Sequence, residues 1–287
     1  MLPFVKIHGC GNSFILIHDQ GQKLNVIKAS FSRYICHEHW GVGADGFILI
    51  EPTPDQATSF KMTYLNADGS DGKLCGNGLR CAARYGYELG FFKDHTKILT
   101  DAGILSVYRL DNSHFRVEIP LLQQPQFNLN LSQTNPYFQS LDFLDTGVPH
   151  LVVGLTNMDI KKLPVAELGQ ELRWHPHFSP HGTNVNFIQS LPNGRIAIRT
   201  FERGVEHETL SCGTGAVAAA IISHYRYSLP SPVHLSTPGG ELAVEFHMKN
   251  HLVSDLFLSG PTMIIAQGFI SPEWLSQYWP DGSWQDI

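Results

Sequence analysis

Two cysteines of this chain stand where a thiol could do acid–base chemistry. Cys75 is followed by the residues GNG and Cys212 by GTG, and a helix-forming stretch begins after each. The first turn of a helix has unpaired N–H groups and the positive end of the helix dipole, which both favour a thiolate over a thiol. The glycines let a ligand approach the backbone, whose N–H groups can hold a carboxylate. We therefore expect a pair of thiols that act on one substrate.

Two such thiols on opposite sides of one carbon could invert its configuration. One thiolate would remove a proton from the substrate Cα, and the opposite thiol would return a proton to the other face. N–H donors at the helix starts would stabilise the charge that develops on the carboxylate. No lysine lies in a context that indicates a pyridoxal site, so we expect this chemistry to need no cofactor.

The surrounding sequence predicts a mixture of helices and strands. Residues 76–90 and 213–226 have the pattern of helices, and Gly90 is a suitable glycine at the end of the first. Short apolar or alternating runs predict strands. They lie at residues 13–19, 46–52, 61–66, 97–120, 150–155, 184–191, 195–202, 233–246 and 251–260. This mixture is typical of an α/β or α+β protein.

The two cysteine motifs belong to an internal repeat. With a shift of 137 residues, CGNGLRCAA falls on CGTGAVAAA, and GNSFILI at residues 11–17 falls on VPHLVVG at residues 148–154. Both halves then have the same order: a turn and strand, a strand that ends in a polar turn, a cysteine and a helix. Two similar domains that face each other would place both cysteines on a common cleft.

A domain boundary is expected near residue 120. The stretch at residues 120–140 is rich in Pro, Gln and Asn and is the best candidate for a linker. We therefore expect a first domain at residues 1–120 and a second domain at residues 121–264.

The composition excludes several functional classes. The chain has 287 residues, of which 43% are hydrophobic and 16% charged, so it can bury the cores of two medium domains. A net charge of −6 without a basic cluster argues against a nucleic-acid partner. No apolar run approaches the ~18–20 residues that cross a bilayer. The first residues lack the apolar region of a signal peptide. We expect a cytoplasmic protein with a small-molecule partner.

The other cysteines and the clustered histidines are interpreted as structural. Five cysteines are an odd number for a reducing compartment, which argues against a disulfide framework. We expect Cys10, Cys36 and Cys81 to be packing residues. The stretches CHEHW at residues 36–40 and WHPHFSPH at residues 174–181 contain several histidines, but neither spacing matches a zinc site well. We expect no metal.

Five stretches follow one another along nearly the whole chain: HGCGNSF, NADGSDGKLCGNGLRCAAR, GVPHLVV, GTNVNF and FERGVEHETLSCGTGAVAAA. Together they resemble the diaminopimelate epimerase family. The resemblance implies a pyridoxal-independent epimerase that converts LL- to meso-2,6-diaminopimelate, on the route to lysine and the cell wall. It also implies an α/β (α+β) fold of two similar, pseudo-symmetric domains. Each would be a mixed sheet wrapped around a central helix, with the active site between them and the C-terminal tail, residues 265–287, returning to the first domain. A homodimer is left open.

The resemblance also assigns roles to the matching positions. Cys75 and Cys212 would be the acid–base pair, and His150 and Glu202 would manage the protons of the thiols. Backbone N–H groups of four residues would hold the reacting carboxylate: Gly76, Asn77, Gly213 and Thr214. Five side chains would contact the amino and carboxylate groups of the substrate: Asn12, Asn66, Asn184, Glu202 and Arg203. An arginine such as Arg203 suits a distal carboxylate because its guanidinium binds two oxygens at once.

Three departures from the family's pattern concern substrate recognition. The family usually has Gln where Gly46 stands and Asn where Val148 stands. The segment GVEHETLSC is one residue longer than usual between ERG and the second cysteine. We expect weaker recognition of the distal end, with some racemisation of glutamate or aspartate beside the epimerisation of diaminopimelate.

Other functions stay open on the residues alone. A racemase of another amino acid, acidic or proline-like, could use the same fold, although Asn66, Asn184 and Arg203 favour a substrate with a second charged end. A dithiol redox protein would use the cysteines differently. Such proteins usually carry a CxxC motif, which this sequence lacks. The two intact cysteines argue against a non-catalytic binding module.

Overall fold

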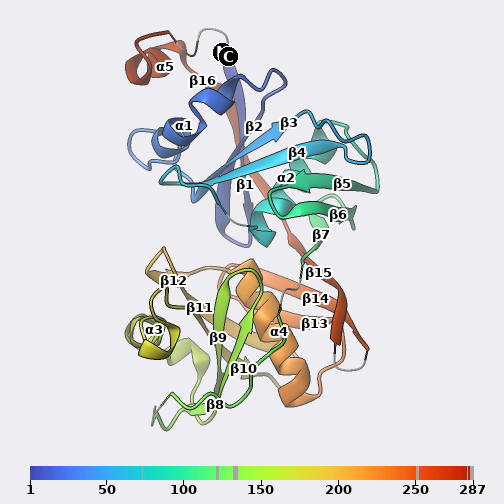
Figure 1. Cartoon of the computed structure of the whole chain (residues 1–287), viewed down its shortest axis with the longest axis vertical. Coiled ribbons are helices and arrows are strands. Elements are labelled where there is room, and N and C mark those ends of the chain that lie inside the picture. Colours follow the sequence, from blue (N-terminus) through green and yellow to red (C-terminus); the bar gives the residue numbers. More distant parts are fainter. Residues whose placement is uncertain (73, 121–122, 132–134, 250–251, 283, 285–287) are drawn as a thin grey trace. The chain divides into compact units, whose positions relative to one another are not determined.

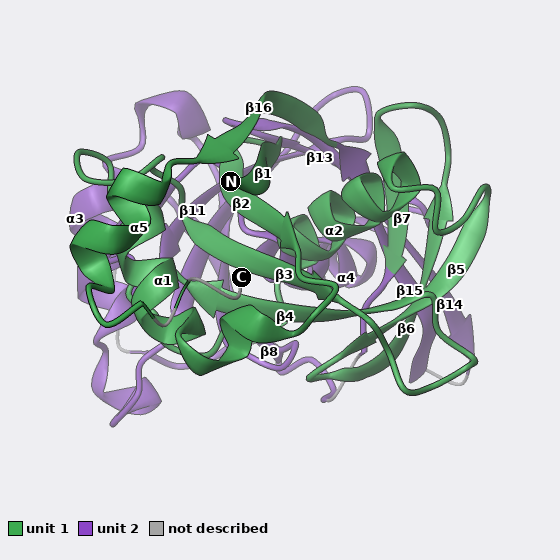
Figure 2. Ribbon diagram, turned by 90° about the horizontal axis from the view of Figure 1, so that it is seen from above, with its two compact units in different colours: residues 1–117, 262–287 green, residues 118–261 purple. Residues whose placement is uncertain are grey.

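The structure is a computed structural model that describes residues 1–72, 74–120, 123–131, 135–249, 252–282 and 284 (Figure 1). Some positions named by the sequence analysis lie outside the described residues: position 73 of the first cysteine motif, 121–122 and 132–134 of the expected linker, 251 of an expected strand, and 283 and 285–287 of the expected tail. The chain forms two compact units (Figure 2). Unit 1 consists of residues 1–117 and 262–287, and unit 2 of residues 118–261.

Unit 1 combines parallel and antiparallel strands with α-helices. Its strands follow one another in space as β16 (Met263–Ile270), β1 (Leu2–Gly9), β2 (Asn12–His18), β3 (Gly46–Glu51), β4 (Phe60–Asn66), β5 (His95–Thr100), β6 (Gly103–Arg109) and β7 (His114–Glu118). The pairs β2–β3 and β4–β5 are parallel, and the other pairs are antiparallel. The helices are α1 (Lys28–Ile35), α2 (Gly76–Glu88) and α5 (Pro272–Tyr278), with the 3₁₀ turn η1 (Lys23–Val26).

The strands of unit 2 are likewise both parallel and antiparallel. Its strands follow one another as β15 (Leu252–Pro261), β14 (Gly240–Lys249), β13 (Val233–Thr237), β11 (Ile196–Glu202), β10 (Asn184–Ser190), β9 (Pro149–Leu155) and β8 (Phe138–Asp145), and β12 (His207–Thr209) pairs with β11. The pairs β9–β10 and β11–β13 are parallel, and the others are antiparallel. The helices are α3 (Val165–Arg173) and α4 (Gly213–Tyr227), with the 3₁₀ turns η2 (Ile160–Lys162) and η3 (Pro176–Phe178).

The two units repeat one plan. From β1 to β7, and from β8 to β15 with β12 left out, successive neighbours are antiparallel, parallel, antiparallel, parallel, antiparallel and antiparallel. Helices α1 and α3 begin at Lys28 and Val165, and α2 and α4 begin at Gly76 and Gly213, so both pairs are 137 residues apart. The expected α+β fold with two similar units and an internal repeat is confirmed.

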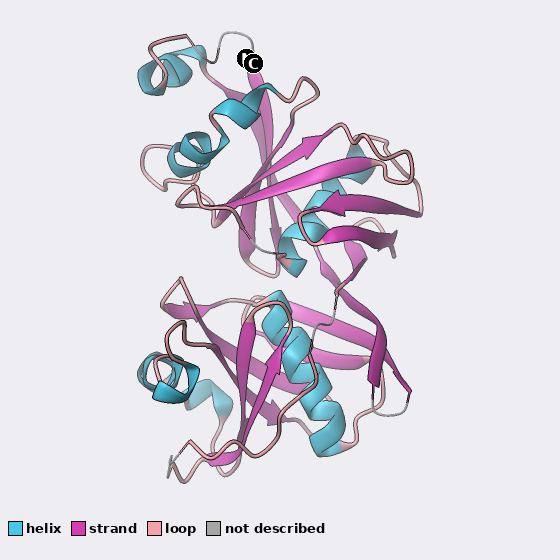
Figure 3. Ribbon diagram, viewed as in Figure 1, coloured by secondary structure: helices cyan, strands magenta, loops and turns pink. Residues whose placement is uncertain are grey.

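One helix in each unit lies among the strands of its own sheet (Figure 3). Helix α2 packs against β1 to β4 and β6, and α4 packs against β8 to β11, β13 and β14. Every residue of α4 from Gly213 to Ser223 is buried. A helix that is covered on all sides needs small and apolar residues all round, which explains the run of alanines. Both predicted helices are present, and Gly90 follows the end of α2 with a positive φ of 78°.

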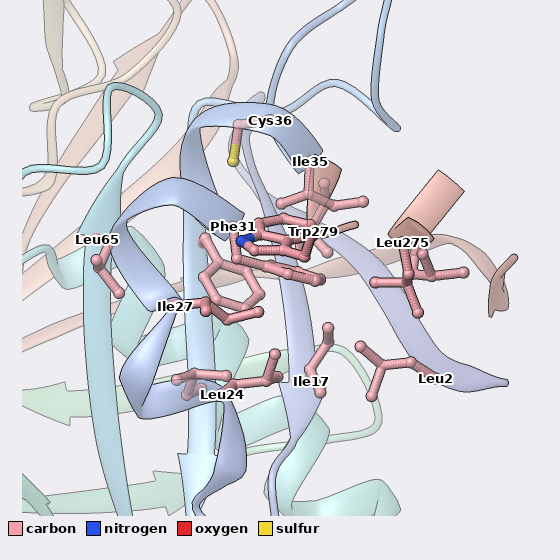
Figure 4. Packing of buried hydrophobic residues seen from close by; sticks show 14 residues of the cluster. Leu2, Ile17, Leu24, Ile27, Phe31, Ile35, Cys36, Leu65, Leu275 and Trp279 are labelled. Atoms are coloured by element: carbon pink, nitrogen blue, oxygen red, sulfur yellow. The ribbon is translucent and has the colours of Figure 1, made fainter. Parts of the chain in front are cut away.

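The other face of each sheet carries its own core. In unit 1, α1 and α5 cover the sheet, and Figure 4 shows Phe31 beside Trp279 in this cluster. These two rings stack with their centroids 5.6 Å apart, and Tyr34 stacks on Tyr278 at 4.0 Å. Strand β16 is paired with β1, so residues late in the chain complete unit 1. In unit 2, α3 covers the corresponding cluster.

Part of the expected linker is packed on unit 2. Gln126 and Phe143 exchange two backbone hydrogen bonds of 2.8 Å, and the N–H of Leu129 donates to the carbonyl of Leu141. Leu131 is buried in the core of unit 2. The interpretation of this stretch as a linker is therefore wrong for residues 123–131. Its Pro and Asn residues suit a segment at the edge of a sheet as well as they suit a loop.

Candidate active site

Cys75 is the N-cap residue of α2. Its backbone is extended (φ −115°, ψ 110°), and its Sγ accepts a hydrogen bond from the N–H of Gly78 at 3.4 Å. The half-buried thiol also lies 3.7 Å from Oδ1 of Asn12, to which it donates. An N-cap side chain usually accepts this bond with an oxygen. The sulfur in its place lies at the positive end of the helix dipole.

Cys212 has the same position in unit 2. It is the N-cap residue of α4 with φ −112° and ψ 114°, and its Sγ accepts from the N–H of Gly215 at 3.4 Å. The thiol is buried and lies 3.5 Å from the hydroxyl of Thr214. The first N–H groups of each helix have no partner within the helix. They belong to Gly76 and Asn77 in α2, and to Gly213 and Thr214 in α4.

A chain of polar side chains surrounds Cys75. Asn12, the first residue of β2, accepts at Oδ1 from the thiol and also from Nδ2 of Asn77 at 3.3 Å. Its own Nδ2 donates to the carboxylate of Asp45 at 3.2 Å. Asn77 accepts at Oδ1 from the guanidinium of Arg80 at 2.9 Å. The chain therefore runs from a carboxylate to a guanidinium, and the thiol is bonded to it at Asn12.

Asn66 lies at the end of β4, opposite Gly46 of β3. Its Oδ1 accepts from the hydroxyl of Tyr64 at 3.0 Å, and its Nδ2 donates to the hydroxyl of Ser70 at 3.0 Å. Tyr64 and Cys75 both line a small open pocket of unit 1. The other lining residues are Met62, Gly72, Leu74, Thr100, Asp101 and Ala102. Tyr64, which donates to Asn66, thus lines the same pocket as the thiol.

His150 is buried beside the start of α4. Its Nδ1 accepts a hydrogen bond of 3.1 Å from Nδ2 of Asn186, whose Oδ1 accepts from the hydroxyl of Thr200. These partners leave the ring proton on Nε2, a buried nitrogen without a hydrogen-bond partner among the described residues. Burial, and then the charge of Arg203, lower the pKa of His150 to about 3. The imidazole is therefore neutral at physiological pH and can only donate from Nε2.

Asn184 joins three segments of unit 2. Its Nδ2 donates to the carbonyl of Pro149 at 3.1 Å, and its Oδ1 accepts from the backbone N–H of Arg203 at 2.8 Å. Val148 directly precedes Pro149 and is half-buried. Val148, Asn184 and Arg203 thus lie close together, and the side chain of the valine offers no hydrogen bond. Burial, and then the charge of Arg173, lower the pKa of Arg203.

The longer segment after Arg203 closes on itself. Gly204 and Glu206 both have positive φ values, 88° and 61°, and the N–H of Gly204 donates to the Glu206 carboxylate at 2.8 Å. The same carboxylate pairs with the guanidinium of Arg173 at 3.0 Å. Glu202, at the end of β11, accepts from the hydroxyl of Thr209 at 2.8 Å. The extra residue is therefore absorbed in a compact loop beside Glu202.

Comparison with known proteins identifies the family. A family model described as diaminopimelate epimerase matches residues 4–119 and 143–262. A diaminopimelate epimerase of Aquifex aeolicus is 38% identical over 282 residues, which cover 95% of this chain and 99% of that protein. A second, from Hydrogenobaculum sp., is 37% identical over 276 residues, covering 93% and 98%. The chain belongs to the diaminopimelate epimerase family.

Solved structures of other proteins have the same fold as this member of the diaminopimelate epimerase family. A phenazine biosynthesis protein of the PhzF family from Bacillus anthracis matches with a TM-score of 0.70 at 13% identity, covering 94% of this chain and 99% of that one. A probable proline racemase from Agrobacterium radiobacter K84 matches with a TM-score of 0.70 at 15% identity, covering 100% of both. At these identities the likeness concerns the fold alone.

The structure connects some of the expected site residues within each unit. Asn12, Cys75 and Asn77 form one hydrogen-bonded group, and the side chain of Asn184 accepts from the backbone N–H of Arg203. Glu202 and Asn66 are bonded to other neighbours. Four residues with a part in these contacts were missed by the sequence analysis: Asp45, Tyr64, Arg80 and Asn186. Asn186 alone had a visible signal, because it alternates with Asn184 along a strand and so faces the same side.

The described part of the chain contains neither a group of metal-binding side chains nor a helix that could span a membrane. No three His, Cys, Asp or Glu side chains among the described residues are grouped as a metal ion would need. No helix in the described part is long and apolar enough to cross a membrane.

Proposed function

We propose that this chain converts LL-2,6-diaminopimelate to meso-diaminopimelate without a cofactor, with Cys75 and Cys212 as its acid–base pair. The observation that carries the proposal is the match between the two N-caps. Each cysteine has nearly the same backbone angles, and each sulfur accepts from the N–H three residues later at 3.4 Å. Family membership and the names of the relatives support diaminopimelate as the substrate.

The proposed reaction transfers one proton at each face of the carbon. A thiolate takes the proton from Cα and becomes a thiol, and the electron pair of the C–H bond moves toward the carboxylate. The second thiol then donates its proton to the opposite face and becomes a thiolate. N–H groups of the first helix turns, at Gly76, Asn77, Gly213 and Thr214, would stabilise the carboxylate as charge builds on it.

His150 and Glu202 are proposed to manage the thiol protons. A neutral imidazole with its proton on Nε2 can donate a hydrogen bond to a thiolate, and its buried Nε2 lacks another partner among the described residues. The Glu202 carboxylate, which accepts from Thr209, could receive a thiol proton or hold the substrate ammonium. The two groups therefore differ in chemistry, one a donor and one an acceptor.

The residues around Arg203 are proposed to bind the distal end of the substrate. Arg203 lies near Arg173, Asp145 and Glu206, and its own guanidinium would bind two oxygens of an incoming carboxylate. Asn184 fixes the backbone of Arg203. Asn66, whose amide is held by Tyr64 and Ser70, is proposed as the matching contact in unit 1. These groups favour a substrate with two charged ends.

The test of this proposal follows Cα in deuterated water. Purified protein should interconvert LL- and meso-diaminopimelate and place deuterium at the inverted centre. Cys75→Ala and Cys212→Ala should each lose inversion by at least about 10²-fold, because each face needs its own proton carrier. Cys36→Ala removes a cysteine from the α1 core and serves as the control. Near-normal inversion by either site variant would rule out the two-thiol mechanism.

Val148 favours a second activity on shorter acids. An asparagine at this place would leave an unpaired amide when no distal group is bound, and such unpaired groups are what reject an analogue. Valine carries no such penalty. We expect measurable racemisation of L-glutamate or L-aspartate, which a chiral assay would detect against Cys75→Ala as the blank. No D-isomer above the blank would disprove relaxed specificity, and Val148→Asn should lower any such activity relative to diaminopimelate epimerisation.

The cytoplasmic location remains a prediction of this proposal, which leaves a homodimer open. A mechanism that uses two thiols requires that they stay reduced, which the cytoplasm provides.

A further inference from the structure

The hydrogen-bond chain at Cys75 has ends of opposite and fixed polarity. The carboxylate of Asp45 can only accept hydrogen bonds, and the guanidinium of Arg80 can only donate them. Two asparagine amides, of Asn12 and Asn77, lie between these ends. An amide can turn by 180° and exchange its oxygen and nitrogen, but a fixed end decides which atom it must present.

The two ends therefore determine both amide orientations. Asn12 must turn Nδ2 to Asp45, so its Oδ1 faces the thiol of Cys75. Asn77 must turn Oδ1 to Arg80, so its Nδ2 donates to Asn12. Turning Asn12 alone would place two oxygens together at Asp45 and two N–H donors together at Asn77. The orientation of Asn12 is thus held from both sides.

Asp45 is itself held firmly. One of its oxygens, Oδ2, accepts from the backbone N–H of Ser13 at 2.7 Å and from the Ser13 hydroxyl at 3.0 Å, besides Asn12. Its own N–H donates to the carbonyl of Ser13 at 3.0 Å. The carboxylate therefore cannot turn away from Asn12 without losing its bonds to Ser13 at the start of β2.

The sulfur of Cys75 makes contacts that suit a thiol. It accepts from the N–H of Gly78 and donates to Oδ1 of Asn12. A thiolate at the same place would face the lone pairs of that oxygen with no proton between them. We propose that Asp45 is a positioning residue that acts through Asn12 to favour the protonated form of Cys75. The inference rests on the proposed function, because it makes Cys75 the proton donor of the pair in the resting enzyme.

Several charged or titratable groups of unit 1 surround Cys75. The Arg80 guanidinium, fully buried, favours a thiolate, and the carboxylates of Asp45 and Asp101 oppose one. Tyr64 lines the pocket with Cys75, and Cys10 and Cys81 lie around Arg80. Burial raises the pKa of Cys81, so this residue stays a thiol. A test must therefore separate the orientation of Asn12 from the charge of Asp45.

The test measures the alkylation rate of each cysteine against pH, resolved by mass spectrometry and without substrate. Asp45→Asn frees the Asn12 amide to turn its N–H to the sulfur. The midpoint pH of Cys75 should fall by about one unit, so that alkylation below the midpoint speeds up about tenfold. Asp101→Asn removes a neighbouring carboxylate without touching Asn12, and we expect a shift of less than half that size. Cys212 should keep its midpoint in both variants.

A double variant isolates the action through Asn12. In an Asn12→Ala background, Asp45→Asn should shift the Cys75 midpoint no more than Asp101→Asn does. An equal shift with and without Asn12 would overturn the proposal, and so would an unchanged or higher midpoint in Asp45→Asn. Should Asp45→Asn not fold, Asn12→Ala alone must still lower the midpoint, since it removes the acceptor of the thiol proton. These readings need no turnover, so failure of the proposed reaction would appear separately, as inactive wild-type protein with intact thiol midpoints.

Discussion

At the scale of single residues, Tyr64 explains the glycine at position 46. A Cβ at Gly46 would lie 2.7 Å from Cε2 of the Tyr64 ring, and a Cβ at Gly72 would lie 2.2 Å from Cδ1 of the same ring. The ring therefore packs against the backbone of two glycines, Gly46 and Gly72. It fills the space in which the family's usual glutamine would begin, and its hydroxyl holds Asn66 instead.

Restoring the glutamine should therefore destabilise the protein. We expect Gly46→Gln to lower the free energy of unfolding by about 1–3 kcal/mol, because Tyr64 cannot move away from position 46 without meeting Gly72. Urea denaturation of the variant and the wild type measures this loss. In a Tyr64→Ala background the same substitution should cost clearly less, and an equal cost in both backgrounds would contradict the explanation. Val148→Asn, at a half-buried turn position, should stay within about 0.5 kcal/mol of the wild type.

At the scale of elements, the starts of α2 and α4 look alike but tolerate different changes. Gly78 and Gly215 both donate to the cap sulfur of their own helix. A Cβ at Gly78 would have ordinary contacts of 3.4 Å or more, whereas a Cβ at Gly215 would lie 2.3 Å from Oδ1 of Asn186. The asparagine that fixes His150 thus depends on a glycine in the neighbouring helix.

The two glycines make a matched pair for substitution. Gly78→Ala should be tolerated or stabilise the protein by up to about 1 kcal/mol, since alanine favours helix more than glycine does. Gly215→Ala should displace Asn186, cost about 1–3 kcal/mol, and remove most of the epimerase activity. Thermal unfolding and an epimerisation assay of both variants give the comparison. Equal changes of stability and activity in Gly78→Ala and Gly215→Ala would show that Asn186 does not need the space beside Gly215.

Sequence patterns predicted the elements better than the contacts between them. Helix α2 and its termination before Gly90 could be predicted, because the residues that start and end a helix act locally. The repeat could be predicted because it preserves the order of turns and strands. The packing of residues 123–131 beside β8 could not, because only a partner strand distant in the sequence reveals it. Asp45, Arg80 and Tyr64 were missed for the same reason: their contacts with Asn12, Asn77 and Gly46 depend on tertiary structure.

At the scale of the whole molecule, a buried neutral histidine makes stability depend on pH. The pKa of His150 is lowered to about 3, whereas a histidine in the unfolded chain titrates near its ordinary value of 6.5. Between these values the unfolded chain binds a proton that the folded chain does not, so stability falls as pH falls. From pH 7 to pH 5 this one group should remove about 2 kcal/mol.

Denaturant titrations at several pH values test this dependence. The free energy of unfolding of the wild type should fall more steeply between pH 7 and pH 5 than that of His150→Gln. The variant is less stable at pH 7, because Asn186 loses its partner, and the two curves should approach each other in acid. His207→Gln, at an exposed position, should follow the wild-type slope. Parallel curves for His150→Gln and the wild type would mean that the imidazole is not held neutral.

The split composition of unit 1 has a consequence for synthesis on the ribosome. Strand β1 emerges before unit 2, but β16, which pairs with it, and α5, whose neighbouring Trp279 stacks on Phe31, follow the whole of unit 2. Unit 2 is one continuous stretch and can fold as it emerges. Throughout that time β1 keeps an open strand edge, which invites pairing with other chains. A chaperone that protects the nascent chain would therefore have its target at the open edge of strand β1.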